Sequence, residues 1–260
     1  MQMILIAGQA GVGKTTLAHL IAKEVFDGGQ IPVLLSFAGS LKAEAARKGY
    51  TKEEFPDKYR EYCQSIGASK RVEDEDYWVK VLDKSVQENI RKETEDMENS
   101  SKFWERVIII DDCRYLNELG YSTLYNAVTL FLSTGNRVLE KTEWREHESE
   151  LLAQRLEGGD DPLVDAFTDI VYNDGPLGDL QKVVKANAPF WAGKEVPCDA
   201  EGLCTCVACK AARDGTQPIL ADIIESLADI LFLSELKEEL ENEVEEEDET
   251  EDEETQDSDT

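Results

Sequence analysis

The sequence predicts an α/β fold, in which a parallel sheet of about five strands is covered by helices on both faces. Two features support this prediction. Short runs that are apolar throughout recur along the first 182 residues, and segments with a helical spacing of apolar residues lie between them. Apolar strands without alternation are typical of a parallel sheet buried on both faces, and such a sheet needs helical connections between its strands.

The predicted strands are residues 3–7 (MILIA), 31–37 (IPVLLSF), 107–110 (VIII), 127–132 (AVTLFL) and 169–172 (DIVY). Residues 15–26 have apolar side chains at helical spacing and are followed by two glycines, so a helix is predicted there. A second helix is predicted from about residue 77 to residue 95, because apolar side chains recur at every fourth position and form one stripe.

The chain after about residue 182 has a different composition. Residues 183–234 contain four clustered cysteines without clear periodicity and then a wide apolar helical pattern at 219–233. Residues 235–260 contain 16 acidic residues and one lysine, and this composition cannot bury a core. The predicted domains are therefore a core at 1–182, a cysteine-containing insert with a C-terminal helix at 183–234, and an acidic disordered tail at 235–260. The tail serves either solubility or an interaction.

The charge of the chain limits its partners. Of the net charge of −29, the tail carries −15 and residues 1–234 carry −14. An acidic protein is not expected to bind nucleic acid directly or to bind an anionic membrane. No apolar run reaches the roughly 18–20 residues that span a bilayer, and six cysteines without a secretion signal favour reduced thiols or metal ligands. We therefore expect a cytoplasmic protein.

The strongest motif is the phosphate-binding loop, residues 8–15 (GQAGVGKT), which matches G-x-x-x-x-G-K-[ST] between a predicted strand and a predicted helix. In such a loop the backbone N–H groups point at phosphate oxygens. Lys14 neutralises β- and γ-phosphate charge, and the Thr15 hydroxyl completes a Mg²⁺ shell. The alternative is a glycine-rich turn that only connects the strand to the helix. The predicted nucleotide-binding residues are Gly8, Gly11, Val12, Gly13, Lys14, Thr15 and Thr16.

Two carboxylates follow the strand at 107–110, and an acid at this position holds Mg²⁺ in proteins with this loop. We assign that role to Asp112, together with Thr15, and assign none to Asp111. Arg114 places a guanidinium where it can bind a transferring phosphoryl group. The alternative is a solvated turn with a local Asp–Arg pair.

Further segments follow in a fixed order: SFAGSLK at 36–42, YREYCQSIG at 59–67, Arg71, DYW at 76–78, DDCRYLNE at 111–118, HESE at 147–150 and YNDGPLGDL at 172–180. Together with the phosphate-binding loop, this order resembles the phage and bacterial deoxynucleoside monophosphate kinase family, which is related to the adenylate kinase-like P-loop kinases. The resemblance covers roughly residues 3–182. It implies the three-layer P-loop NTPase fold and transfer of the γ-phosphoryl of ATP, with Mg²⁺, to a deoxynucleoside monophosphate. It also implies a lid near 137–160 and, for a phage-encoded protein, the host cytoplasm. Whether the chain is a monomer or a homodimer stays open.

The resemblance implies an acceptor site across from the phosphate-binding loop. There Arg60 would bind the acceptor phosphate and Gln64 a base edge, while Arg145 would belong to the lid. The implied catalytic residues are Lys14, Asp112, Arg114 and Arg145. The implied substrate-binding residues are Ser36, Phe37, Lys42, Arg60, Gln64, Arg71, Trp78 and Glu150.

Several of these assignments have simpler alternatives. Arg60 and Arg71 could be surface arginines, Gln64 a surface amide, and Trp78 lies on the apolar stripe, which favours a place in the core. The sequence also departs from the family at positions 39–40, where Gly-Ser replaces an acidic residue followed by proline. That change puts the acceptor or metal contact of the missing carboxylate in doubt.

The clustered cysteines are Cys198, Cys204, Cys206 and Cys209. Four thiolates could hold structural Zn²⁺ in a tetrahedron. Free thiols, or a redox or oligomer-linking role, are the alternatives.

The expected function is phosphoryl transfer from ATP to deoxynucleoside monophosphates, giving diphosphates for DNA synthesis. Two alternatives remain. One is a P-loop kinase of another small acceptor, such as a nucleoside or a sugar acid. The other is a non-kinase P-loop regulatory or binding protein.

Overall fold

The computed structural model describes residues 1–51, 54–99, 104–135, 147–157 and 161–194. All of them belong to the first of two compact units into which the chain divides, Met1–Gly215 and Thr216–Thr260. The expectations for Arg145, the clustered cysteines, the helix at 219–233 and the acidic tail lie outside the described residues. Among the helices that are described, none combines the length and the apolar character needed to cross a membrane.

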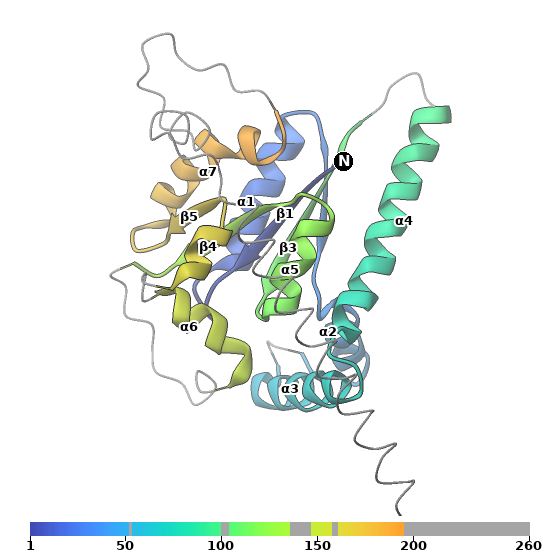
Figure 1. Cartoon of the computed structure of the whole chain (residues 1–260), viewed down its shortest axis with the longest axis vertical. Coiled ribbons are helices and arrows are strands. Elements are labelled where there is room, and N and C mark those ends of the chain that lie inside the picture. The colour runs from blue at the N-terminus through green and yellow to red at the C-terminus, as the bar shows by residue number, and fades with distance from the viewer. Residues whose placement is uncertain (52–53, 100–103, 136–146, 158–160, 195–260) are drawn as a thin grey trace, which may run out of the picture. The chain divides into compact units, whose positions relative to one another are not determined.

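The centre of the described unit is a five-stranded parallel sheet with the order β2-β3-β1-β4-β5, and Figure 1 shows helices on both of its faces. The strands are β1 (Gln2–Ala7), β2 (Ile31–Leu35), β3 (Arg106–Cys113), β4 (Val128–Ser133) and β5 (Asp169–Tyr172). The predicted fold class is confirmed. β2 ends two residues before the predicted strand does, and β3 continues through both aspartates that the prediction placed after it.

Alternate side chains of the central strands enter two separate cores. In β1, Met3 and Leu5 belong to one buried cluster, whereas Ile4 and Ile6 belong to the other, and none of the four is more than 1% exposed. Because both faces are covered, both sets must be apolar. This is why the strand appears in the sequence as an uninterrupted hydrophobic run.

The first face of the sheet is covered by α1 (Lys14–Asp27) and α7 (Leu177–Trp191). The core therefore extends past residue 182, the predicted end of the first domain. Val184, Ala188 and Trp191 are buried at spacings of four and three residues, which is helical, although the sequence analysis found no periodicity there. The pattern is hard to recognise because the small Ala188 provides part of the stripe and because Pro189, a residue unfavourable inside helices, lies within it.

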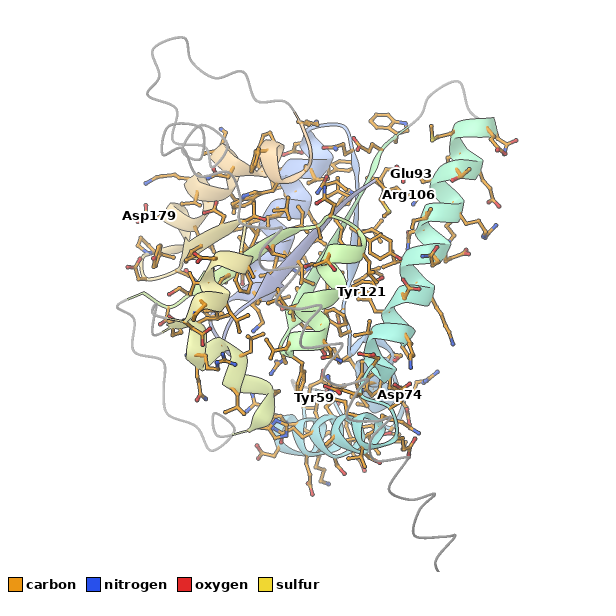
Figure 2. All side chains as sticks on the ribbon, in the orientation of Figure 1. Tyr59, Asp74, Glu93, Arg106, Tyr121 and Asp179 are labelled. Atoms are coloured by element: carbon orange, nitrogen blue, oxygen red, sulfur yellow. The ribbon has the colours of Figure 1, made fainter. Side chains whose placement is uncertain are left out.

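The second face is covered by α4 (Tyr77–Asn99), α5 (Leu116–Leu124) and α6 (Leu151–Glu157). The predicted stripe of α4 is buried at Trp78, Leu82 and Val86, and the helix continues past its predicted end. Figure 2 shows Tyr121 extending from α5 toward α4, where its hydroxyl donates a hydrogen bond to Asp83 Oδ1 at 2.8 Å. The C-terminal half of α4 also contacts the sheet, because Glu93 accepts a hydrogen bond from the backbone N–H of Arg106 in β3 at 3.0 Å.

Of the remaining elements, α2 (Gly39–Arg47), α3 (Pro56–Glu73) and the short 3₁₀ helix η2 (Glu148–Glu150) lie at the carboxyl ends of the strands. The 3₁₀ helix η3 (Pro162–Ala166), in contrast, precedes β5 and lies at the amino ends of β4 and β5. Figure 1 shows α3 at the end of the sheet opposite the N-terminus of β1. In open parallel sheets ligands bind outside the carboxyl ends of the strands. The position of α2 and α3 therefore indicates where a ligand site should lie.

If α7 completes the core, Trp191→Ala should destabilise the protein by about 3–5 kcal/mol, because the side chain is fully buried and its removal leaves a cavity. Urea unfolding would measure this change. Trp104→Ala is the matched control, since that side chain is 50% exposed and its loss should cost less than about 1 kcal/mol. Equal unfolding midpoints for the two variants would contradict the packing role of α7.

Candidate active site

A cavity of about 430 Å³, here called the site cavity, lies between the phosphate-binding loop and α3. Its volume falls within the roughly 300–1,000 Å³ that small-molecule sites occupy. The predicted site residues that line it are Gly11, Gly13, Lys14, Thr15, Thr16, Phe37, Lys42, Arg60, Gln64, Arg71, Trp78, Asp112, Arg114 and Glu150. Residues from positions 10 to 150 of the chain therefore meet in one place. Arg145 lies outside the described residues.

Two glycines give the phosphate-binding loop its shape. Gly8 and Gly13 have φ values of +147° and +110°, in the region that favours glycine. A Cβ atom at Gly8 would lie 2.5 Å from the carbonyl oxygen of Leu132, and one at Gly13 would lie 2.8 Å from Nδ2 of Asn173. The same Asn173 amide donates a hydrogen bond to the carbonyl of Val12 at 2.6 Å. Gly8 and Val12 therefore do not line the cavity, but they hold the loop against the ends of β4 and β5.

The Lys14 side chain is 7% exposed and turns back over its own loop. Its ammonium group donates hydrogen bonds to the carbonyl oxygens of Gly8 and of Gln9, the latter at 2.8 Å. Burial, assisted by the nearby Arg114 guanidinium, lowers the pKa of Lys14 to about 8, although neighbouring carboxylates act in the opposite direction. A positive charge is therefore held at the loop with little water around it.

Asp111, to which the sequence analysis gave no role, is the carboxylate that faces the loop. Its Oδ2 accepts a hydrogen bond from the Thr15 hydroxyl at 2.8 Å. A hydroxyl and a carboxylate at this distance are the hard oxygen donors that suit Mg²⁺, which takes few protein ligands and completes its shell with phosphate and water. The residues present therefore fit a magnesium ion, with Asp111 in the place that was predicted for Asp112.

Asp112 points to the opposite face of β3 and orders the chain after β2. Its carboxylate accepts hydrogen bonds from the backbone N–H of Phe37 at 2.8 Å and from Lys42 Nζ at 2.8 Å. Burial acts to raise the pKa of Asp112, but the Lys42 ammonium and the Phe37 amide outweigh it, so the pKa lies below its usual value. Lys42 also donates to Ser36 Oγ at 2.8 Å, which places Ser36 behind the cavity wall. The arrangement differs from the prediction, because consecutive strand residues point to opposite faces.

Glu118 holds the guanidinium of Arg71 in the wall of the cavity. Oε1 of this buried carboxylate accepts a hydrogen bond from Arg71 Nη2 at 2.7 Å, and the guanidinium lies over the Tyr115 ring at 3.8 Å. Burial, followed by the charge of Asp112, raises the pKa of Glu118 to about 7, although Arg71 opposes the shift. Arg71 is thus fixed in position rather than free on the surface, and the stacking partner Tyr115 was not identified from the sequence.

The face of α3 that lines the cavity carries Tyr59, Arg60, Cys63, Gln64 and Arg71. Their spacing of three, four and seven residues is that of one helix face. Trp78 is 5% exposed and belongs to the core cluster, as its place on the apolar stripe predicts, and it also borders the cavity. Its indole N–H donates to the carbonyl oxygen of Gly67 at 3.1 Å. Core packing and cavity lining are therefore compatible for this side chain.

The titration of Lys14 predicts how nucleotide affinity depends on pH. Below about pH 8 the side chain is charged and attracts phosphate; above it the charge is lost, so the dissociation constant for ATP should rise by about tenfold per pH unit. Fluorescence titration between pH 7 and 9.5 would measure this dissociation constant. The terminal phosphate, with a pKa near 6, stays ionised over this range, so its own titration does not contribute to the change. Thermal unfolding at each pH is the control. A constant affinity over this range would show that Lys14 does not provide the charge.

The comparisons with known proteins agree with this geometry. The model of a family described as NTPase matches residues 3–162 of the chain. A comparison with curated proteins found no match. The matched range covers more than half of the chain, and it contains the phosphate-binding loop, α3 and the end of β3 with its two aspartates. The chain therefore belongs to this NTPase family and is a P-loop nucleotide-binding protein.

Proposed function

We propose that the protein transfers the γ-phosphoryl group of ATP to a deoxynucleoside monophosphate. The observation that carries this function is that the site cavity has a second cationic group besides the phosphate-binding loop. Lys42, Arg60 and Arg71 line its other half, which comes from α2 and α3. In a protein of net charge −29, such a concentration of cations favours an anionic second substrate.

The donor half would hold ATP through the amides of the phosphate-binding loop, the dipole of α1 and the Lys14 ammonium. Thr15 and Asp111 would hold Mg²⁺, which when bound neutralises charge on the β- and γ-phosphates. Arg114, at the end of β3, would bind the phosphoryl group in transit. An oxygen of the acceptor phosphate forms the new bond to γ-phosphorus, and the bond from that phosphorus to the β–γ bridging oxygen breaks, leaving ADP.

The acceptor half would orient the monophosphate through the guanidiniums of Arg60 and Arg71. Arg71 supports this role because its contacts with Glu118 and Tyr115 fix its direction before any substrate binds. Gln64, one turn beyond Arg60, is within the same wall and can offer an amide to a base edge. Phosphoryl transfer needs alignment and charge neutralisation more than covalent catalysis, and these residues supply both.

Hydrolysis of a nucleoside triphosphate without an acceptor is the second candidate, and the family match favours it. Transfer to another small acceptor, such as a nucleoside or a sugar acid, would need fewer cations opposite the loop. The two arginines on α3 therefore support an acceptor that already carries a phosphate.

A coupled assay of ADP formation, with ATP and a panel of ribo- and deoxynucleoside monophosphates, tests the proposed function. We expect rapid turnover only when a monophosphate is present, and Arg71→Ala should raise the KM for that acceptor by at least about tenfold, because one charge-assisted contact is lost. Turnover that does not depend on any monophosphate would support hydrolysis instead.

The roles of the two aspartates can be separated by mutation. Asp111→Asn should lower turnover roughly 10- to 100-fold and raise the Mg²⁺ concentration needed for half-maximal rate, with stability unchanged. Asp112→Asn should lower the free energy of unfolding by about 2 kcal/mol, because its buried hydrogen bonds are to charged and backbone donors. Asp179→Asn, which removes an exposed carboxylate on α7, is the control for net charge. A Mg²⁺ requirement that shifts only in Asp112→Asn would reverse the assignment.

A further inference from the structure

The buried carboxylate of Glu150 contacts the phosphate-binding loop. The residue is 3% exposed, and its Oε2 accepts a hydrogen bond from the backbone N–H of Ala10 at 2.7 Å. Its Oε1 accepts a hydrogen bond from Nη1 of Arg114, with which it also forms an ion pair. One carboxylate from η2 therefore joins the loop that follows β1 to the arginine that follows β3.

Both of these donors are groups that bind phosphate. Ala10 lies within the phosphate-binding loop, whose backbone N–H groups surround phosphate oxygens in proteins with this motif. The planar guanidinium of arginine binds carboxylate and phosphate with the same two-pronged geometry. Ala10 has a single N–H, which a phosphate cannot use while Glu150 accepts from it. At Arg114 the phosphate and the carboxylate are two anions that compete for the same guanidinium.

We propose that Glu150 is an internal competitor of the nucleotide, and that triphosphate binding exchanges its carboxylate for a phosphate at Ala10 and Arg114. This role rests on the nucleotide-binding half of the proposed function and does not depend on the acceptor. Glu150 then acts as a positioning residue. Glu150 holds the Arg114 guanidinium near the loop before the nucleotide binds, and the guanidinium then binds the phosphate instead of Glu150.

The exchange requires movement of the side chain only. α6, which begins at the next residue, is held by the buried side chains of Leu152, Ala153 and Leu156. The backbone N–H of Arg114 is bound to Glu118 at 2.8 Å, so the guanidinium can follow a phosphate while its main chain stays in place.

A consequence is selection against small anions. Inorganic phosphate gains little by displacing Glu150, because it replaces one pair of contacts with another. A nucleoside triphosphate gains more, since it also engages the other loop amides and Lys14. The internal carboxylate therefore makes the loop more selective for polyphosphates, at some loss of affinity.

The variant Glu150→Gln tests this role, because it keeps the shape of the side chain and removes its charge. In calorimetric titration of the full-length protein with Mg²⁺ and ATP, we expect the dissociation constant to fall by about tenfold, since the nucleotide no longer breaks a charge-assisted contact. Inorganic phosphate should become a measurable competitor. The KM for ATP should fall in the same variant, whereas the loss of a purely structural contact would raise it.

Asp165→Asn is the matched control, because it removes one exposed carboxylate from η3, away from the site cavity. Its affinity for ATP should equal that of the wild type. Unchanged or weaker ATP binding by Glu150→Gln would overturn the competition, and so would a nucleotide complex of the wild type with Glu150 still bonded to the Ala10 amide. If Glu150→Gln binds ATP more tightly but the protein transfers phosphate to no monophosphate, the proposed acceptor is wrong and the competition by Glu150 still holds.

Discussion

The end of β3 is the constraint on which the rest of the site depends. Two adjacent carboxylates there point to opposite faces of the strand, so one contacts Thr15 at the start of α1 and the other contacts the chain that leads into α2. Asp111 therefore belongs to the half of the cavity that contains the phosphate-binding loop, and Asp112 to the half formed by α2 and α3. Because both are part of one central strand, the distance between the halves is set by the sheet itself and does not depend on a flexible connection.

Charge balance inside the cavity follows from the same arrangement. Three cations of the cavity each have an acidic partner: Lys42 pairs with Asp112, Arg71 with Glu118, and Arg114 with Glu150. The three carboxylates are buried, and burying them unpaired would cost several kcal/mol each, so the cations compensate them. The pairs also differ in use. The partners of Lys42 and Arg71 hold these cations in the cavity wall formed by α2 and α3, whereas the partner of Arg114 also contacts the phosphate-binding loop.

The parts of the site that lie within one short segment were predictable from the sequence. The phosphate-binding loop is contiguous, and its glycines have the positive φ values that the motif requires. The stripe on α4 was also predictable, since its spacing is local. Arg60, Gln64 and Arg71 on α3 were named through a family resemblance, and the structure brings them to one cavity. The contact between Asp111 and Thr15 was not predicted, because β3 is buried on both faces and so has no polar alternation to show which carboxylate faces α1. The last turns of α7 were not predicted, because their buried stripe includes an alanine and because a proline lies within the helix.

The class of fold and the phosphate-binding motif could be recognised from the sequence, because continuous apolar strands and an unbroken motif are properties of neighbouring residues. Which side chains contact that loop depends on how the chain folds. Thr15 and Asp111 are 96 positions apart, and Ala10 and Glu150 are 140 positions apart. Contacts over such separations depend on the order of strands in the sheet and on the direction in which each side chain leaves its strand or helix, and no local pattern records either.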